Sequence, residues 1–521
     1  MRRELTKYLR LPTMSRMETG AVLSRRPAVV GGLLLILMLL TGLGWAVSSP
    51  VESSPDDNYH LGSIWCPRPA GESCQTSVVD GDPVVRVPIA VADESMRCYV
   101  LQSNKSAGCA LGYDDSHMVW SKRFDNGAYP IGYYHFHHLL VGKDVQTSVL
   151  VMRGVNVLIA VTLLGTIGFC APRQLRRPFI GAIVASWVPM GVYFIASNNP
   201  SSWAVSGLMA YSAATFMAPQ QNGRRRIALV ICAVIGAVMC LTSRYDAAFF
   251  LLVVGLALLF AVPWKRGGWI GLSALAGVAL LGFGTFMASS QVSKVAYFLR
   301  VFEASDPAKS ADKQPFFEKL LVGLETAPKY LGGFWGHTWT PGWHDVPLGA
   351  RAPYVLTIMA AGAFVAVGLR RGGWRKWTAL AIIVGSMVLL PALFYANGAM
   401  DTIELYQARY IFPLLAPTFF LMLAVDQDEG AWFTVPQAVW VTVFISLCQT
   451  ITLHTLLLRF VQGAQERWEL DLNKHIEWWW SAPVSPMMVW FLTTCLATAA
   501  LGTAIAMLTR TADKHEAPQE S

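Results

Sequence analysis

The chain has 521 residues, of which 54% are hydrophobic and only 14% are charged. A soluble globular protein carries roughly 25% charged residues. The composition, with a mean hydropathy of +0.42, therefore excludes an ordinary soluble enzyme and predicts an all-α polytopic membrane protein. The formal net charge is +8. Because basic residues collect in the cytoplasmic loops of membrane proteins, this charge gives no reason to expect nucleic acid as a partner.

Twelve apolar stretches are predicted to be transmembrane helices, since about 20 apolar residues span roughly 30 Å of hydrocarbon. The first stretch, 28–48, has a cleaved signal peptide as its alternative. Its apolar run is longer than a usual signal core and no clear Ala-x-Ala site closes it, so we expect a retained helix. The twelve stretches are centred near residues 38, 158, 187, 210, 234, 255, 278, 361, 386, 416, 445 and 498.

Basic residues predict the orientation, because Lys and Arg favour the cytoplasmic side. With twelve spans and a cytoplasmic N-terminus, the clusters at 173–177, 224–226, 265–266 and 370–376 all fall on that side. The expected divisions are a cytoplasmic N-terminus (1–27), TM1 (28–48), an extracytoplasmic loop (49–146), TM2–TM7 (147–289), a second extracytoplasmic loop (290–352), TM8–TM11 (353–456), an interfacial Trp-rich segment (457–486), TM12 (487–509) and a cytoplasmic tail (510–521).

Four of the nine cysteines lie in the first extracytoplasmic loop. An even number of cysteines in such a loop predicts two disulfides in an oxidising compartment. Three pairings are possible, of which Cys66–Cys74 with Cys98–Cys109 is the most local. Zinc ligation is less favoured, because the loop has no Cys-x-x-Cys spacing.

Short elements are also expected around this loop. Asp82–Val91 alternates like a strand, Arg97–Leu101 resembles another strand, and Asn58–Trp65 is compatible with a helix lying on the membrane. The tryptophans Trp478–Trp480 are expected to anchor the last loop at the membrane interface, with stacking on a sugar as the alternative.

The segment Ser54–His60 follows directly on the first apolar stretch and contains Asp56, Asp57 and His60. A carboxylate pair so close to a membrane surface can act as a general base, a metal ligand or an anchor for a sugar hydroxyl. The alternative is that the two acids only cap the next helix, since Asp is a preferred N-cap residue. No cofactor is certain, and a divalent cation is possible.

Further polar residues at the same extracytoplasmic boundary are expected, together with His60, to bind the substrate or its phosphate: Arg153, Asn199, Arg244, Asp246, Arg409 and Tyr410. Charged residues at membrane depth are costly and tend to mark function. Arginine binds phosphate bidentately and stays charged, so the set suits a lipid-linked phosphate donor. Structural alternatives stay open: an Arg244–Asp246 bridge, a snorkelling Arg153, and Arg409 as a helix-end anchor.

Together these motifs resemble those of the GT-C glycosyltransferases and, within them, the bacterial DUF2142-type membrane proteins. The matching motifs are Pro55–His60, Tyr129-Pro130 with Tyr133-Tyr134, Asn199-Pro200 and Arg409–Pro413. The acidic pair is Asp-Asp where many relatives are expected to have Asp-Glu, and the four loop cysteines are not a feature of the resemblance. It implies a GT-C-like fold, a catalytic carboxylate at Asp56 or Asp57, and a polyprenyl-phosphate sugar donor.

We therefore expect an inverting glycosyltransferase in a bacterial plasma membrane, acting on a glycan or glycolipid acceptor outside the cell. Asp57 is the favoured base, the other acid orients the acceptor or binds a cation, Arg244 and Arg409 hold the donor phosphate, and Arg153 supports them. The Ala/Gly/Val-rich basic composition is typical of an actinobacterium, which makes decaprenyl-phospho-arabinofuranose a candidate donor. The alternatives are a polysaccharide polymerase or ligase that uses a lipid pyrophosphate-linked oligosaccharide, and a lipid-linked sugar transporter.

Overall fold

The computed structural model describes residues 27–92, 98–112, 114–264, 268–289, 315–348, 352–398, 402–403, 406–426, 432–464, 469–481 and 483–509. Almost all of the expected N-terminal segment 1–27, the tail 510–521, the basic pair Lys265/Arg266 and much of the loop 290–352 lie outside the described residues.

Apolar helices make up most of the described chain. They are α2 (Pro27–Ala46), α7 (Val145–Cys170), α8 (Arg176–Ser186), α9 (Pro189–Ile195), α10 (Ser201–Met217), α11 (Gly223–Ser243), α12 (Tyr245–Ala261), α13 (Trp269–Met287), α17 (Ala352–Gly368), α18 (Trp374–Ala396), α19 (Leu415–Ala424), α20 (Val435–Val461) and α21 (Pro486–Thr509). The other α-helices are α3 (Asp57–Trp65), α4 (Ala70–Ser73), α6 (Gly132–His138), α15 (Phe316–Glu325) and α16 (Ala327–Gly332).

Seven helices in the described part of the chain are long and apolar enough to cross a membrane: α2, α7, α11, α13, α18, α20 and α21. An eighth crossing arises if α8 and α9, which meet at a 91° bend, count as one broken span. Pro189 begins α9 and has no N–H to continue the helical ladder, which accounts for the break. Eleven of the twelve expected centres fall within helices, and residue 187 falls at this bend.

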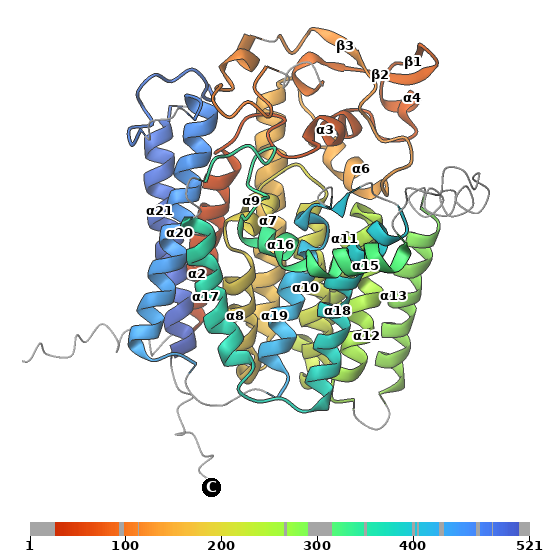
Figure 1. Ribbon diagram of the computed structural model, residues 1–521, viewed down its shortest axis with the longest axis vertical. Helices are drawn as coiled ribbons and strands as arrows, with labels where there is room; N and C mark the ends of the chain where they lie inside the picture. The colour runs from red at the N-terminus through yellow and green to blue at the C-terminus, as the bar shows by residue number, and fades with distance from the viewer. Residues whose placement is uncertain are drawn as a thin grey trace, which may run out of the picture.

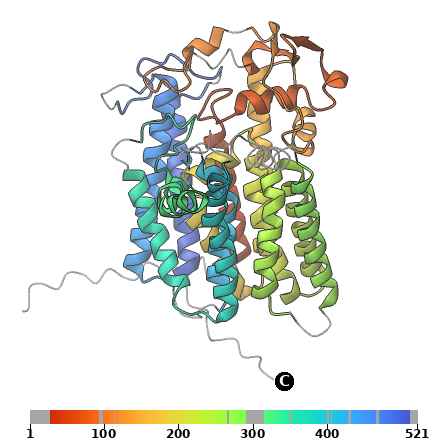
Figure 2. The same ribbon diagram turned by 45° about the vertical axis from the view of Figure 1, so that its right-hand side comes forward.

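The small sheet and α3 lie together at one end of the helix bundle, which we call the loop end (Figures 1 and 2). The sheet has the order β1-β2-β3 and consists of β1 (Thr76–Val79), β2 (Asp82–Pro88) and β3 (Met118–Ser121), all antiparallel. Asp80 and Gly81 form the β1–β2 turn, both with positive φ, as a tight hairpin requires. The opposite end, called the basic end, carries the α17–α18 connection with Arg370 and Arg371 (Figure 1).

Several loop expectations are confirmed and others are wrong. The strand expected within Asp82–Val91 is β2, and the helix expected over Asn58–Trp65 is α3. Residues 98–101 form turns instead of the expected second strand, and Arg97 lies outside the described residues. The disulfides are Cys66–Cys74 and Cys98–Cys109, the most local of the three pairings.

Two tryptophans of the expected interfacial segment pack inside the protein, and the position of this segment relative to the membrane stays a prediction. Trp478 and Trp480 are buried within the protein, and the Trp480 indole N–H donates to the carbonyl of Val47 at 2.7 Å. They hold the last loop against the end of α2.

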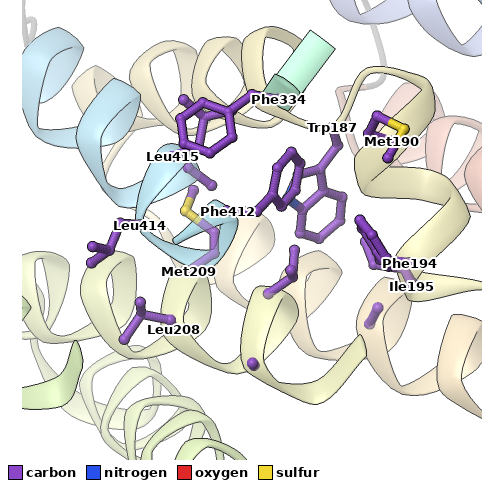
Figure 3. Packing of buried hydrophobic residues seen from close by; sticks show 14 of the residues in the cluster. Trp187, Met190, Phe194, Ile195, Leu208, Met209, Phe334, Phe412, Leu414 and Leu415 are labelled. Carbon is purple, nitrogen blue, oxygen red and sulfur yellow. The ribbon is translucent and has the colours of Figure 1, made fainter. Parts of the chain in front are cut away.

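The core is densest around α10, whose residues are all buried except Thr215. A helix that is buried on every side reads as apolar all round, and α10 contacts α7, α11, α12 and α19. Above it, Phe412 packs against Phe194 and Phe334, with ring centroids 6.2 and 5.7 Å away (Figure 3). This contact fixes the segment that contains Arg409 against the broken α8–α9 pair.

Candidate functional site

Asp56 lies at the loop end of the bundle with its backbone in the left-handed conformation, at φ 63°. Asp is one of the few residues that adopt this conformation readily. Its side chain makes no cap hydrogen bond with α3, so helix capping does not explain it. Instead, Oδ2 lies 2.5 Å from Nη2 of Arg409, and Oδ1 lies 3.7 Å from Nη2 of Arg123.

The Asp56 side chain is 34% exposed, while that of Arg409 is 3% exposed. Burial acts to raise the pKa of the Asp56 carboxyl. The charge of Arg409, with smaller effects of His60 and Arg123, outweighs it and holds that pKa below its ordinary value. Asp56 is therefore an ionised carboxylate that solvent and a ligand can reach.

Asp57 is fully buried and points away from this opening. Its two carboxyl oxygens accept from the hydroxyl and the backbone N–H of Ser54, and Oδ2 lies 3.9 Å from Nη2 of Arg153. Burial raises the pKa of the Asp57 carboxyl above its ordinary value, opposed by the charge of Arg153. The adjacent acids thus occupy different environments, and the accessible one is Asp56, whereas we expected Asp57 to act as the base.

The guanidinium of Arg153 is engaged by backbone carbonyls, whereas we expected it to support a phosphate. Its guanidinium donates to the carbonyls of Ala46 at 3.0 Å, Ser49 at 2.6 Å and Pro50 at 2.7 Å. The side chain is only 1% exposed. These three acceptors end α2 and begin the next turn, so Arg153 joins α7 to the exit of the first helix.

Asn199 and Arg409 both hold the carbonyl of Pro55, the residue just before Asp56. Asn199 Nδ2 donates to it at 3.0 Å and Arg409 Nη1 at 3.1 Å. The Asn199 side-chain oxygen in turn accepts from the backbone N–H of Ser201 at 2.9 Å. The Asn-Pro turn and the Arg-Tyr segment therefore position the left-handed backbone of Asp56, and Asn199 acts on the site through that backbone.

Arg244 and Asp246 form the bridge that was one of the open alternatives. Arg244 Nε and Nη2 donate to the two oxygens of Asp246 at 2.9 and 2.7 Å. The guanidinium also lies 5.6 Å from the ring centroids of both Tyr129 and Tyr410. The guanidinium of Arg409 lies 5.1 Å from the centroid of the same Tyr410 ring. Tyr410 therefore contacts both arginines that we expected to bind phosphate.

His60 is fully buried beside these groups. Its Nδ1 lies 3.0 Å from the hydroxyl of Tyr134, and its ring packs edge-on against Tyr129. Burial lowers the pKa of His60 to about 3. A neutral imidazole does not bind phosphate through charge, so His60, which we expected to bind substrate or phosphate, packs against Tyr129 and Tyr134 beside the site.

Sequence reasoning missed Arg123, which follows β3 and faces both Asp56 and the ring of Tyr59. Nothing in the residues around Arg123 signals this role, because the contact depends on how the sheet folds back over α3. For the possible divalent cation, the described residues contain no group of three or more His, Cys, Asp or Glu side chains able to hold a metal ion.

A family model described as a predicted membrane protein (DUF2142) matches residues 39–418. This range contains every residue of the site, from Asp56 to Tyr410. No curated protein and no solved structure matches the chain.

Proposed function

The chain belongs to the DUF2142 membrane-protein family, and we propose that it is a GT-C-type glycosyltransferase. In this proposal it moves a sugar from a polyprenyl-phosphate donor to a cell-envelope glycan or glycolipid, on the extracytoplasmic side of a bacterial plasma membrane. The observation that carries the proposal is the accessible carboxylate of Asp56, which lies between the guanidinium groups of Arg409 and Arg123.

Asp56 is the general base of the proposed reaction. Its Oδ2 is engaged by Arg409, whereas Oδ1 lies at the longer distance of 3.7 Å from the half-exposed Arg123. Oδ1 is therefore the oxygen available to accept a proton from an acceptor hydroxyl. A positioned base of this kind contributes roughly 10²–10⁴-fold to a rate.

The arginines supply the charge that a phosphate leaving group needs. In a single displacement, the acceptor oxygen forms a bond to the anomeric carbon while the bond from that carbon to the phosphate oxygen breaks, with inversion. The acceptor proton passes to Asp56, and the electron pair leaves with the phosphate. Arg409 and Arg244 both lie against the ring of Tyr410, and guanidinium groups stabilise developing negative charge.

Aromatic residues around the acid suit a sugar ring. Tyr129 and Tyr410 contact Arg244, and Tyr59 lies under Arg123. Tyrosine rings present an apolar face and a polar hydroxyl. A sugar ring likewise has an apolar C–H face that packs on the ring and hydroxyl groups that form hydrogen bonds.

The features at the two ends of the bundle support the proposed orientation. The two disulfides at the loop end are typical of an oxidising, extracytoplasmic compartment. The arginines of the α17–α18 connection at the other end are typical of a cytoplasmic face. A twelve-span GT-C-like arrangement follows if the α8–α9 pair, α10, α12, α17 and α19 also cross the membrane.

The test measures sugar transfer in membranes of a deletion strain that expresses each variant. Labelled polyprenyl-phosphate sugars serve as donors, decaprenyl-phospho-arabinofuranose among them. We expect Asp56→Asn to lower turnover at least about a hundredfold. The control is Asp82→Asn, because Asp82 is an exposed acid on β2 that pairs with Lys122, away from Asp56. Expression and membrane insertion are checked for both variants.

Wild-type turnover in an Asp56→Asn/Asp57→Asn double variant would end the proposal. If arginine variants were inactive while both Asp variants kept full activity, the chain would act as a polymerase or ligase on a pyrophosphate-linked oligosaccharide. Movement of a labelled substrate without a covalent product would identify a transporter.

A further inference from the structure

A cavity lies within the helix bundle, away from Asp56. It is a cavity of about 230 Å³ between α2, α7, α8, α20 and α21, which we call the α2–α8 groove. Gly31, Leu35, Gly42, Val157, Ile180 and Ala500 are among its lining residues. Figure 1 shows α2, α20 and α21 next to one another on this side of the bundle.

The groove has the length of one membrane leaflet. It follows α2 from Gly31 to Gly42, which at 1.5 Å per residue is about 16 Å. The hydrocarbon core of a bilayer is roughly 30 Å thick. At one end Gly31 faces the ring of Phe169, near the close of α7, and at the other Gly42 faces Val157. The groove therefore extends from the basic end to about mid-membrane.

Positive charge gathers at the basic end of this groove. Arg176 lines it, and the guanidinium groups of Arg173 and Arg225 act on Arg176 electrostatically. In the part of the chain that the structure describes, none of these three arginines forms an ion pair with a carboxylate. Arg176 Nε is buried without a hydrogen-bond partner, and Nη2 reaches only the carbonyl of Phe169 at 3.4 Å.

We propose that the α2–α8 groove binds an anionic phospholipid of the adjacent leaflet. One acyl chain lies along α2, and the lipid phosphate binds Arg176 with Arg173 and Arg225. An apolar groove of leaflet depth matches a lipid with one negative charge when it ends in arginines that have no ion-pair partner among the described residues. Arginine pairs with phosphate bidentately, and anionic lipids are attracted to basic residues at the cytoplasmic surface. This site lies at the end of the bundle opposite Asp56 and does not depend on sugar transfer.

The test measures lipid retention by the purified full-length protein in native mass spectrometry. Dioleoyl phosphatidylglycerol is compared with dioleoyl phosphatidylcholine, which has the same chains and no net charge. Wild type is expected to retain the anionic lipid preferentially, and Arg176→Gln to bind it about tenfold more weakly. Arg375→Gln is the matched control, because Arg375 is an exposed arginine of α18, which does not line the groove.

Two further variants keep the proposal testable if Arg176→Gln does not fold. Arg173 is exposed, so Arg173→Gln is expected to fold and to weaken retention of the anionic lipid. Ala500→Phe fills the groove and is expected to reduce retention while the arginines stay in place. Equal retention of both lipids by wild type, or unchanged retention in Arg176→Gln and Arg173→Gln, would overturn the proposal.

Two competing ligands identify the source of the phosphate. Soluble glycerol phosphate is expected not to displace the lipid, and complete displacement would make this a site for free phosphate. Undecaprenyl phosphate is expected to bind no more tightly than phosphatidylglycerol, and tighter binding would overturn the assignment to a diacyl lipid. Because no turnover is measured, failure here leaves the proposed glycosyltransferase activity unaffected.

Discussion

The carboxylate of Asp56 and the guanidinium of Arg409 are in contact across 353 residues of sequence, with Oδ2 and Nη2 2.5 Å apart. The same guanidinium holds the carbonyl of Pro55. Arg409 thus sets both the charge state of the acid and the backbone turn that presents it. The segments after α2 and before α19 therefore act as a single unit.

This dual contact predicts that lysine cannot replace Arg409. A single ammonium group does not reproduce the planar fork that bonds two acceptors at once. We expect Arg409→Lys to lower kcat for sugar transfer by at least about tenfold, measured in steady-state assays with varied donor. Arg123→Lys is the control and is expected to have a smaller effect, because Arg123 is 43% exposed and lies 3.7 Å from Asp56. Equal losses in both variants would contradict the assignment of Arg409 as the main partner.

Asp57 is predicted to act on stability instead of catalysis. Asp57→Ala leaves the Ser54 hydroxyl and N–H without their buried acceptor, which is expected to cost about 2–3 kcal/mol. Asp57→Asn keeps an oxygen acceptor and is expected to lose less. Thermal unfolding of the purified protein in detergent measures the change, with turnover per folded molecule measured alongside. Catalytic loss in Asp57→Asn without any loss of stability would show that Asp57 takes part in the reaction.

Arg153 is predicted to be needed for folding. Arg153→Met leaves the carbonyls of Ala46, Ser49 and Pro50 without their donors in a buried site, and an unfolding free energy lower by about 3 kcal/mol is expected. Denaturation of the purified protein is the measurement. The control is Arg86→Gln, because Arg86 is exposed on β2 and bonds Gln75. A phosphate-binding role would instead raise the KM for the donor and leave the stability unchanged.

The apolar pattern predicted where the helices lie, because burial in lipid or protein demands apolar side chains in either case. The pattern could not say which helices are long enough to cross a membrane. For example, α12 and α17 have 17 residues each, fewer than the roughly 20 that a span needs. The β1–β2 hairpin was missed although Asp80-Gly81 is a strong turn signal. The local disulfide pairing was among the three possibilities that the cysteine spacing allowed.

The candidate site was predicted less completely than the helices. Sequence placed Asp56 and Asp57 side by side and could not separate them, because the difference arises from one left-handed residue. With φ at 63°, Asp56 turns toward Arg409 while Asp57 turns into the core. The role of Arg153 was hidden for a similar reason, since its partners are backbone carbonyls, which no side-chain pattern reveals.

Acid is predicted to destabilise the protein through His60. Burial lowers its pKa to about 3 from an ordinary 6.5, although the charge of Asp56 opposes the fall, and the guanidinium groups of Arg244, Arg409 and Arg123 add to it. Below about pH 6.5, the His60 side chain therefore binds a proton in the unfolded chain but stays neutral in the folded chain. The contribution of His60 to stability is complete above that pH and falls by up to about 1.4 kcal/mol per pH unit on acidification toward pH 3. His60→Gln is expected to reduce this loss of stability between about pH 6.5 and pH 3, measured in a series of thermal unfolding curves. The control His117→Gln, at an exposed histidine, is expected to leave the loss unchanged.

Other buried histidines keep part of this pH dependence in the variant, such as His137, whose pKa burial lowers to about 4. If the stability of His60→Gln fell with acid as steeply as that of the wild type, the His60 imidazole would be charged in the folded protein. The assignment of a neutral His60 beside Asp56 would then be wrong.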